Sequence, residues 1–405
     1  MTILTQQDIN DYCANLNIPR SELSEFIIPD GVTKIDFRAF KECRALTSVT
    51  IPESVAEIGI DAFSYCNSLT SITIPDSVTE IGQRAFKYCR SLTTITIPDS
   101  VTRIHNGVFS NCHSLTSITI PDSVTQIDYH TFSDCTSLRS IIIPDGVTYI
   151  DHCTFRNCTS LESITIPKSV FFISSEAFNG CSALTSITIP EGVTTIEYEA
   201  FQNCTSLTSV TIPDSVTRIA NSTFRNCTSL ESISIPNSVK EISNCTFQNC
   251  TSLTSITIPD GVTKIGILAF HECTSLTSIT IPDSVNDIGR DAFLDCTSFT
   301  QVICNNPDLF TYENINIDQI EIISTTAYFK EHYQDLLNTI EDSGSNSNHV
   351  SSKELNLIMK LHQEDYLPNW KTLATTFNER SMDQIRSILH YFNKTNCMPD
   401  TENSI

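Results

Sequence analysis

Apolar and polar positions follow a pattern that repeats every 23 residues along most of the chain. Counted from a proline, leucine lies six positions before it and isoleucine or valine three and one before it. Valine, isoleucine, phenylalanine and cysteine then lie three, six, eleven and fourteen positions after it. A fixed period of about 20–29 residues with recurring leucine and isoleucine is typical of a solenoid. The prolines define twelve repeats without insertion: Pro29, Pro52, Pro75, Pro98, Pro121, Pro144, Pro167, Pro190, Pro213, Pro236, Pro259 and Pro282.

Each repeat predicts three short elements. The alternating Ser-Ile-Thr-Ile before the proline predicts a strand with its isoleucines inward, which the proline ends. Asp-Ser or Asp-Gly then predicts a turn, and Val-Thr-x-Ile a second short extended segment. Ala-Phe-x-x-Cys predicts a single helical or 3₁₀ turn that packs its phenylalanine between repeats. Because parallel strands stack about 4.8 Å apart, the repeats together predict a parallel sheet.

The repeated phrase LxxIxIPxSVxxIxxxAFxxCxS resembles the BspA-type leucine-rich repeats first associated with Treponema and Bacteroides surface antigens. The similarity covers residues 23–304. It implies a right-handed solenoid used for binding, with no catalytic residues to carry over. We therefore expect an α/β solenoid, a leucine-rich-repeat array with short parallel strands.

Both ends of this array predict covering elements, because a solenoid must cover the apolar faces of its terminal repeats. Residues 1–22 predict an N-terminal helical cap. In it Thr5 and Asp8 have the spacing of a helix start, and Ile9, Tyr12 and Leu16 fall on one face. Residues 305–342, where the repeat degrades, contain a strand-like segment and an amphipathic helix and predict a C-terminal cap.

The residues after the array predict a separate small unit. Residues 343–352 are rich in Ser, Gly and Asn and indicate a flexible linker, followed by a three-helix module at 353–396 and a tail at 397–405. The spacing of Trp370, Arg380 and Arg386 resembles the second and third helices of Myb and SANT domains. That resemblance implies a last helix that enters a DNA groove or grips a protein.

Charge decides between partners for this module. Residues 350–405 hold six basic and seven acidic side chains, a net charge of −1. Because phosphate neutralisation supplies much of DNA affinity, a protein partner fits better than DNA. A helical bundle without any nucleic-acid role stays open as the plain alternative.

The whole chain is acidic. It has 24 Lys plus Arg against 47 Asp plus Glu, a formal net charge of −23. This charge argues against bare nucleic acid and against an anionic membrane as partners of the whole chain, which leaves nucleic acid open only for the C-terminal module. The first residues lack a basic region followed by an apolar run, so we expect a cytoplasmic protein. Export into a host cell without a cleaved signal is the alternative.

Twelve of the 17 cysteines share one position of the repeat. A small, weakly polar side chain that prefers burial suits such a column, so we expect buried reduced thiols rather than disulfides. The column consists of Cys43, Cys66, Cys89, Cys112, Cys135, Cys158, Cys181, Cys204, Cys227, Cys250, Cys273 and Cys296.

The outward positions of the first strand are almost uniformly Thr and Ser, which gives a lattice of hydroxyl groups. Such a lattice suits a repeating polymer such as a polysaccharide, although β propensity alone also explains it. A protein footprint is expected where the lattice is interrupted. The interruptions that we select as partner-binding candidates are Arg139, Glu162 and Glu231.

One group of residues has metal-ligand chemistry. His105, Asp128, Tyr129, His130, Asp151, His152 and Cys153 lie in neighbouring positions of three adjacent repeats. Since the same positions vary freely elsewhere in the array, we interpret the group as surface variation and expect no metal and no cofactor. The chain has no Ser-His-Asp order, no Gly-rich phosphate loop and no HExxH motif.

These observations predict a non-enzymatic protein-binding scaffold. The array presents a leucine-rich-repeat surface to a protein partner, and the helical module recruits a second one. Two alternatives stay open: an exported effector of an intracellular bacterium that acts on host chromatin or signalling proteins, and a surface adhesin or polysaccharide-binding protein.

Overall fold

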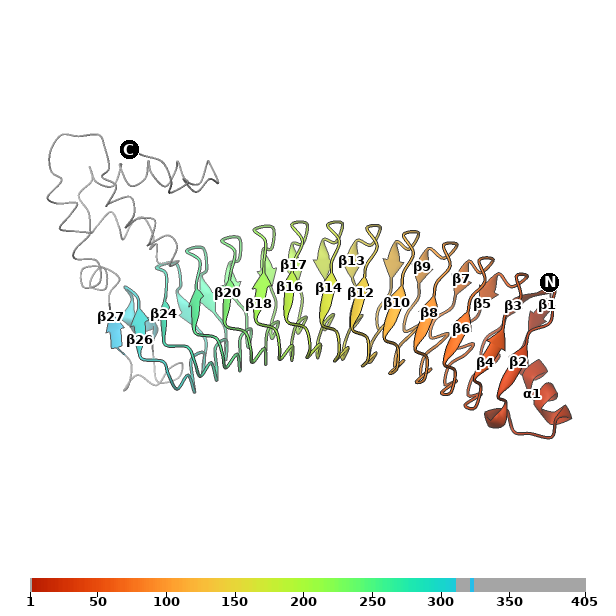
Figure 1. Cartoon of the computed structure of the whole chain (residues 1–405). Helices are drawn as coiled ribbons and strands as arrows, with labels where there is room; N and C mark the ends of the chain where they lie inside the picture. Colours follow the sequence, from red (N-terminus) through yellow and green to blue (C-terminus); the bar gives the residue numbers. More distant parts are fainter. Residues whose placement is uncertain (1, 311–320, 324–405) are drawn as a thin grey trace, which may run out of the picture.

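The computed structural model describes residues 2–310 and 321–323. Figure 1 shows the repeats stacked side by side into a long curved array, with residue 2 at one end and strand β27 at the other. Each repeat contributes a first strand before its proline and a second, shorter strand after it. The solenoid of parallel strands expected from the 23-residue period is confirmed.

The first strands stack in one row, which we call the first-strand ladder; within it, groups of two to five strands are hydrogen-bonded, and residues 23 positions apart pair in parallel, as Ser117 does with Thr94. The inward isoleucine or valine is buried in nearly every repeat, as the alternating pattern predicted. The strands are β2 (Glu25–Ile27), β4 (Ser48–Thr50), β6 (Ser71–Thr73), β8 (Thr94–Thr96), β10 (Ser117–Thr119), β12 (Ser140–Ile142), β14 (Ser163–Thr165), β16 (Ser186–Thr188), β18 (Ser209–Thr211), β20 (Ser232–Ser234), β22 (Ser255–Thr257), β24 (Ser278–Thr280) and β26 (Gln301–Ile303), with β27 (Glu321–Ile323) pairing to β26.

The second strands form another ladder with the same register, as in the pairing of Tyr149 with Phe172. It begins with β1 (Thr2–Leu4), which pairs with β3. The others are β3 (Val32–Ile35), β5 (Glu57–Ile58), β7 (Glu80–Ile81), β9 (Arg103–Ile104), β11 (Gln126–Ile127), β13 (Tyr149–Ile150), β15 (Phe172–Ile173), β17 (Thr195–Ile196), β19 (Arg218–Ile219), β21 (Glu241–Ile242), β23 (Lys264–Ile265) and β25 (Asp287–Ile288).

The Ala-Phe-x-x-Cys segment is not helical, so the helical or 3₁₀ turn expected there is wrong. It is a run of turns in which alternate N–H groups bond within the repeat and to the next repeat. Cys43 donates to the carbonyl of Phe40 at 3.1 Å, whereas Phe40 donates to the carbonyl of Ala62 at 2.7 Å. Every second donor is therefore shared between repeats, as in a sheet, and this pattern competes with helix formation.

Two positions in this segment have left-handed backbone, nine and thirteen residues after each proline, with φ between 54° and 64° at the non-glycine residues. Glycine adopts this region freely because it has no Cβ atom, whereas L residues other than Asn and Asp mostly avoid it. The second position follows that preference in most repeats, with Asn111, Asp134, Asn157, Gly180, Asn203, Asn226, Asn249 and Asp295.

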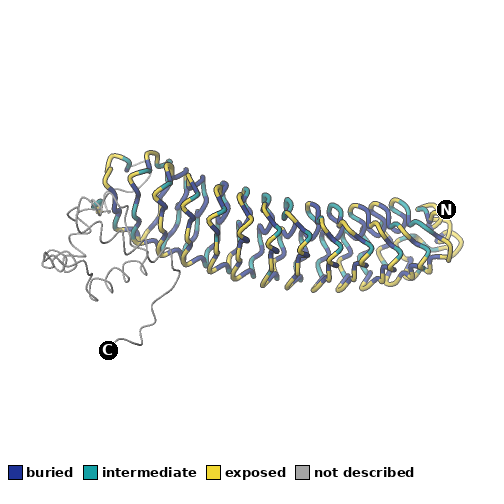
Figure 2. The backbone as a smooth tube through the Cα atoms, turned by 90° about the horizontal axis from the view of Figure 1, so that it is seen from above, coloured by how far each residue is buried: buried dark blue, intermediate teal, exposed yellow. Residues whose placement is uncertain are grey.

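The core consists of columns of identical side chains, and Figure 2 shows buried segments recurring along the array. The phenylalanines from Phe40 to Phe293 stack with ring centroids 5.0–5.9 Å apart and interplanar angles of 12° or less. Stacking a ring on each neighbour buries large apolar area at a constant spacing. The phenylalanine column therefore joins every repeat to the next.

The cysteine column is buried and its described thiols are free, as expected. From Cys66 to Cys296, each thiol donates to the carbonyl of the phenylalanine 26 residues earlier, at 3.0–3.2 Å. Burial raises the pKa of these thiols, to about 12 at Cys204. They are therefore structural donors and not reactive groups.

Helix α1 (Gln6–Asn15) is capped by Thr5, as the spacing of Thr5 and Asp8 predicted. The Thr5 N–H donates to the Asp8 carboxylate at 2.7 Å, and the Asp8 N–H donates to the Thr5 hydroxyl at 3.2 Å. Ile9 is buried, whereas Leu16 is 52% exposed, so the apolar face is narrower than expected. Two 3₁₀ segments, Arg20–Glu22 and Pro307–Leu309, flank the array.

Arg20 donates hydrogen bonds to backbone carbonyl groups of the first repeat. In later repeats, N–H groups of the preceding repeat bond the equivalent carbonyls. In the array, the carbonyl ten residues after a proline accepts an N–H of the preceding repeat, as Ala62 does. At the first repeat, Arg20 donates instead to the carbonyls of Ala39 at 2.6 Å and Lys41 at 2.8 Å. That residues 1–22 act as a cap stays a prediction, which these two bonds support.

The linker at 343–352, the three-helix module at 353–396 and the tail at 397–405 lie outside the described residues, as does most of the C-terminal cap expected at 305–342. In the part that the structure describes, α1 is the one α-helix. No helix there has both the length and the apolar character needed to cross a lipid bilayer.

Candidate binding surface

The outward face of the first-strand ladder is the hydroxyl lattice expected from the sequence, but part of it is used internally. Thr93 donates its hydroxyl to the carbonyl of Thr70 at 3.1 Å, and Thr208 donates to that of Thr185 at 3.1 Å. These threonines lie five residues before their prolines. Because these hydroxyl protons are already bonded, Thr93 and Thr208 offer a ligand acceptors only.

The lattice is interrupted in the middle of the array, where β12 and β14 pair. Arg139 and Glu162 replace threonine directly before these strands, and the Arg139 Nη1 atom lies 2.7 Å from the Glu162 Oε1 atom. On β12, Ile142 is 76% exposed at a position that is Thr in most repeats. We call Arg139, Ile142 and Glu162 the central patch.

Glu231 does not belong to the central patch. It lies three repeats beyond Glu162, at the same position of the repeat. Its backbone carbonyl accepts the Thr254 hydroxyl at 3.3 Å, so the ladder is undisturbed there. The structure therefore brings together two of the three candidates in the array. The remaining candidates, Trp370, Arg380 and Arg386, lie outside the described residues.

An aromatic group on the second-strand ladder was not selected from the sequence. Tyr149 and Phe172 are paired neighbours on β13 and β15. Phe171, which replaces threonine at its position in most repeats, is 53% exposed. The signal was available, because an aromatic residue interrupts a threonine row just as Ile142 does. Tyr149 lies in the same repeat as Ile142, and Phe171 and Phe172 lie in the same repeat as Glu162. The aromatic group therefore belongs to the two repeats of the central patch, but lies on the second-strand ladder.

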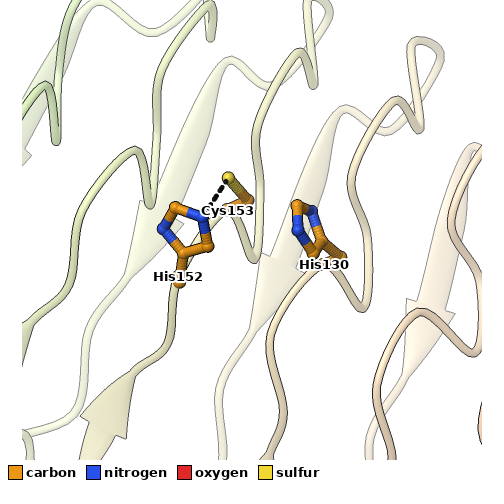
Figure 3. Close-up of side chains that lie close together, drawn as sticks. All are labelled: His130, His152 and Cys153. Carbon is orange, nitrogen blue, oxygen red and sulfur yellow. Dashed lines mark hydrogen bonds between the residues drawn. The ribbon is translucent and has the colours of Figure 1, made fainter.

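His130, His152 and Cys153 come together on the turn segments of two adjacent repeats, as Figure 3 shows. Their ligand atoms all lie within 4.8 Å of one another. The Cys153 Sγ atom lies 3.3 Å from the His152 Nε2 atom, and His152 Nδ1 lies 2.9 Å from the Ser175 carbonyl oxygen. The Cys153 side chain is buried and both histidines are half-buried.

Burial and neighbouring charges tune these groups. Burial, and then the nearby Glu176 carboxylate, raise the pKa of the Cys153 thiol to about 12. Burial also lowers the pKa of His130, with smaller contributions from His152 and Arg156. Both residues are therefore neutral near pH 7. A neutral imidazole can donate a lone pair to a metal at once, whereas the thiol must first lose its proton.

The other members of the group singled out in the sequence have different partners. Asp128 is 5% exposed and is paired with Arg103 at 2.9 Å, and its Oδ2 atom lies 3.6 Å from His105 Nδ1. Asp151 accepts the backbone N–H of His152 at 2.7 Å. Asp128 is thus held by an arginine, which is a structural role. A second group with ligand atoms, His271, Glu272 and Asp295, is more exposed.

Stacked parallel strands with leucine, isoleucine and valine inward define the class of the protein as a leucine-rich-repeat solenoid. The family model of the BspA type Leucine rich repeat region matches residues 19–139, 102–231 and 217–335. The chain therefore belongs to the BspA-type leucine-rich repeat family.

Solved structures agree with this assignment. A leucine-rich repeat protein from Bacteroides ovatus has 28% identity and a TM-score of 0.63, covering 74% of this chain and 92% of its own. A leucine rich cell surface protein from Faecalibacterium prausnitzii has 35% identity and a TM-score of 0.51, covering 72% and 90%. A leucine-rich repeat protein from Eubacterium ventriosum shares the fold at 24% identity, with a TM-score of 0.52 and coverage of 77% and 90%. The comparison with curated proteins gives no match.

Proposed function

We propose that this chain is a non-enzymatic scaffold that binds a protein at the central patch. The observation that carries the proposal is that Ile142, 76% exposed at a position where most repeats have threonine, lies next to the exposed Arg139 and Glu162 side chains. Full burial of an isoleucine side chain is worth about 1.5–3 kcal/mol relative to leaving it exposed to water. The exposed Ile142 side chain lacks most of this stabilisation. A partner that covers Ile142 recovers that free energy.

The charges beside Ile142 fit a binding role as well. The Arg139 and Glu162 side chains are 68% and 59% exposed, so their mutual ion pair contributes only about 0–1 kcal/mol to folding. Both groups therefore stay available to a partner's charges at the rim of an interface. The net charge of −23 favours a basic protein over an acidic one.

The repeat itself supplies a substitution that tests this patch without disturbing the fold. Ile142→Thr restores the residue of the neighbouring repeats. Ile27→Thr is a matched control, because Ile27 lies at the same position five repeats earlier and is also 76% exposed. Proteins captured by the full chain are compared for the two variants by quantitative mass spectrometry, and a photo-crosslinking residue at 142 or 27 reports contact.

A protein retained by the wild type and by Ile27→Thr, crosslinked from position 142 and lost at least tenfold in Ile142→Thr supports the proposal. Equal capture by both variants would contradict the assignment to the central patch. A double charge exchange, Arg139→Glu with Glu162→Arg, keeps the internal pair but reverses its direction. We expect it to weaken the same partner.

The C-terminal module stays part of the proposal as a recruiter of a second partner. Its near-neutral charge supports a protein partner, with Trp370, Arg380 and Arg386 as the candidate contacts. In the full chain, Arg380→Ala with Arg386→Ala should remove the second partner and leave capture at the central patch unchanged. Loss of both partners together would contradict two separate sites.

Surface display is a second candidate role, and the Faecalibacterium prausnitzii relative, described as a cell surface protein, favours it. The cytoplasmic location expected from the N-terminal residues remains a prediction. Protease treatment of intact cells decides between surface display and a cytoplasmic location, because the protease cleaves a displayed array from outside and does not reach a cytoplasmic one.

A further inference from the structure

The histidine and cysteine group joins two repeats through residues that no part of the binding proposal uses. His130 lies in the repeat of Pro121, and His152 and Cys153 lie in the repeat of Pro144. Figure 3 shows the two imidazole rings on either side of the thiol. Two nitrogen ligands and one sulfur ligand within 4.8 Å of one another form a compact set of donors.

A hydrogen bond sets the state of one ligand. His152 Nδ1 lies 2.9 Å from the Ser175 carbonyl oxygen, which can only accept, so Nδ1 carries the proton and donates it. In the neutral ring Nε2 then holds the lone pair, and it lies 3.3 Å from the Cys153 Sγ atom. Metal-binding histidines are oriented in this way, with the second ring nitrogen donating to a backbone carbonyl.

We propose that His130, His152 and Cys153 bind a zinc ion that joins the two repeats. Zinc prefers imidazole nitrogen at about 2.0–2.1 Å and thiolate sulfur at about 2.3 Å in a tetrahedral arrangement. Those bond lengths place neighbouring ligand atoms about 3.3–3.7 Å apart, and the Cys153 to His152 separation of 3.3 Å already fits. Rotation of the half-buried His130 ring supplies the third ligand.

Binding has a defined proton balance. The Cys153 thiol loses its proton to solvent as the zinc–sulfur bond forms, and no oxidant or reductant is involved. Three protein ligands leave the fourth position to water or to a side chain of a partner. The half-buried histidines leave the site open to an ion from solvent.

The array contains an internal comparison for this site. Cys245 lies at the same position of the repeat as Cys153, with nearly the same backbone φ of 56° against 54°. The residue before it is Asn244 instead of a histidine. A cysteine at this position therefore needs no histidine in order to fold, and Cys245→Ala is a matched control for Cys153→Ala.

Cobalt titration of the full chain tests the proposal, because a thiolate bound to Co²⁺ gives a near-ultraviolet charge-transfer band that histidine and carboxylate ligands do not. We expect this band to saturate at one equivalent in the wild type and in Cys245→Ala, and to be lost in Cys153→Ala. His152→Asn, which copies Asn244, should weaken it at least tenfold. A band that persists in Cys153→Ala, or no band in the wild type, would overturn the proposal.

Thermal unfolding with Zn²⁺ gives an independent readout. Zinc bound to the folded state alone should raise the Tm of the wild type and of Cys245→Ala, and should leave that of Cys153→Ala unchanged. An equal shift in all three proteins would assign the effect to ligands other than Cys153 and would contradict the site.

Discussion

Arg20 is expected to stabilise the N-terminal end of the array, because it donates the hydrogen bonds that the N–H groups of a preceding repeat supply elsewhere in the array. Its guanidinium donates to the carbonyls of Ala39 and Lys41, which in later repeats are the places that accept backbone N–H groups. A hydrogen bond to a charged group contributes about 1.5–3 kcal/mol. Because Arg20 is part-exposed and solvent competes for it, we expect Arg20→Ala to cost about 2–3 kcal/mol locally.

Hydrogen exchange measured by mass spectrometry locates this effect. In a solenoid each repeat contacts only its neighbours, so the loss should appear in the first two repeats and fade beyond them. Arg44→Ala is the matched control, because Arg44 is 61% exposed and its nearest acidic oxygen, on Glu42, is 3.8 Å away. It should change protection by less than about 0.5 kcal/mol.

Two results would refute the reasoning about Arg20. One is an effect of Arg20→Ala no larger than that of Arg44→Ala. The other is an equal loss of protection in all twelve repeats, which would mean that the array unfolds as one unit. Arg20→Lys separates charge from geometry: a single ammonium is not expected to serve both carbonyls, so it should restore less than half of the protection.

Three further predictions concern the phenylalanine column, the cysteine column and Asp260, the residue after Pro259. Phe155→Ala, which removes a fully buried ring stacked between Phe132 and Phe178, should cost about 3–5 kcal/mol in urea unfolding. Native alkylation at pH 8 should leave the cysteine column unmodified by mass spectrometry, because burial holds the pKa of Cys43 at about 11. Burial, and then Asp283, raise the pKa of Asp260, which disfavours the folded state once Asp260 ionises. Asp260→Asn should therefore raise the Tm at pH 7 and not below the usual pKa of aspartate.

The sequence was sufficient to predict the strands and the buried columns that recur in each repeat. Stacking places the same position of each repeat next to its equivalent in the neighbouring repeats. A residue type that recurs at one position therefore predicts a column, as it does for the buried Phe and Cys columns and for the first strand. The turn segment was predicted wrongly because the five residues of Ala-Phe-x-x-Cys are too few for periodicity to separate a helical turn from a run of turns. The left-handed positions could have corrected this, since Asn, Asp or Gly recurs thirteen residues after most prolines.

The contacts of Arg20 were not predicted, because its partners carry no side-chain signal. The two acceptors of Arg20 are backbone carbonyls, which are the same at every residue. The pairing of Arg139 with Glu162 was within reach, because residues 23 apart are neighbours in this fold. Phe171 and Phe172 were within reach as well, because they interrupt polar rows in the same way as Ile142.

A substitution at an outward position of this array leaves the core columns in place, because the side chains of those columns are buried and stack on the same positions of the two neighbouring repeats. Cys153 and Cys245 illustrate this: the backbone is the same, yet one cysteine lies against a histidine and the other follows an asparagine. The central repeats carry Ile142, Phe171 and the zinc ligands without any change in the Phe or Cys columns. Folding does not require these departures from the repeated sequence. We therefore infer that they serve binding.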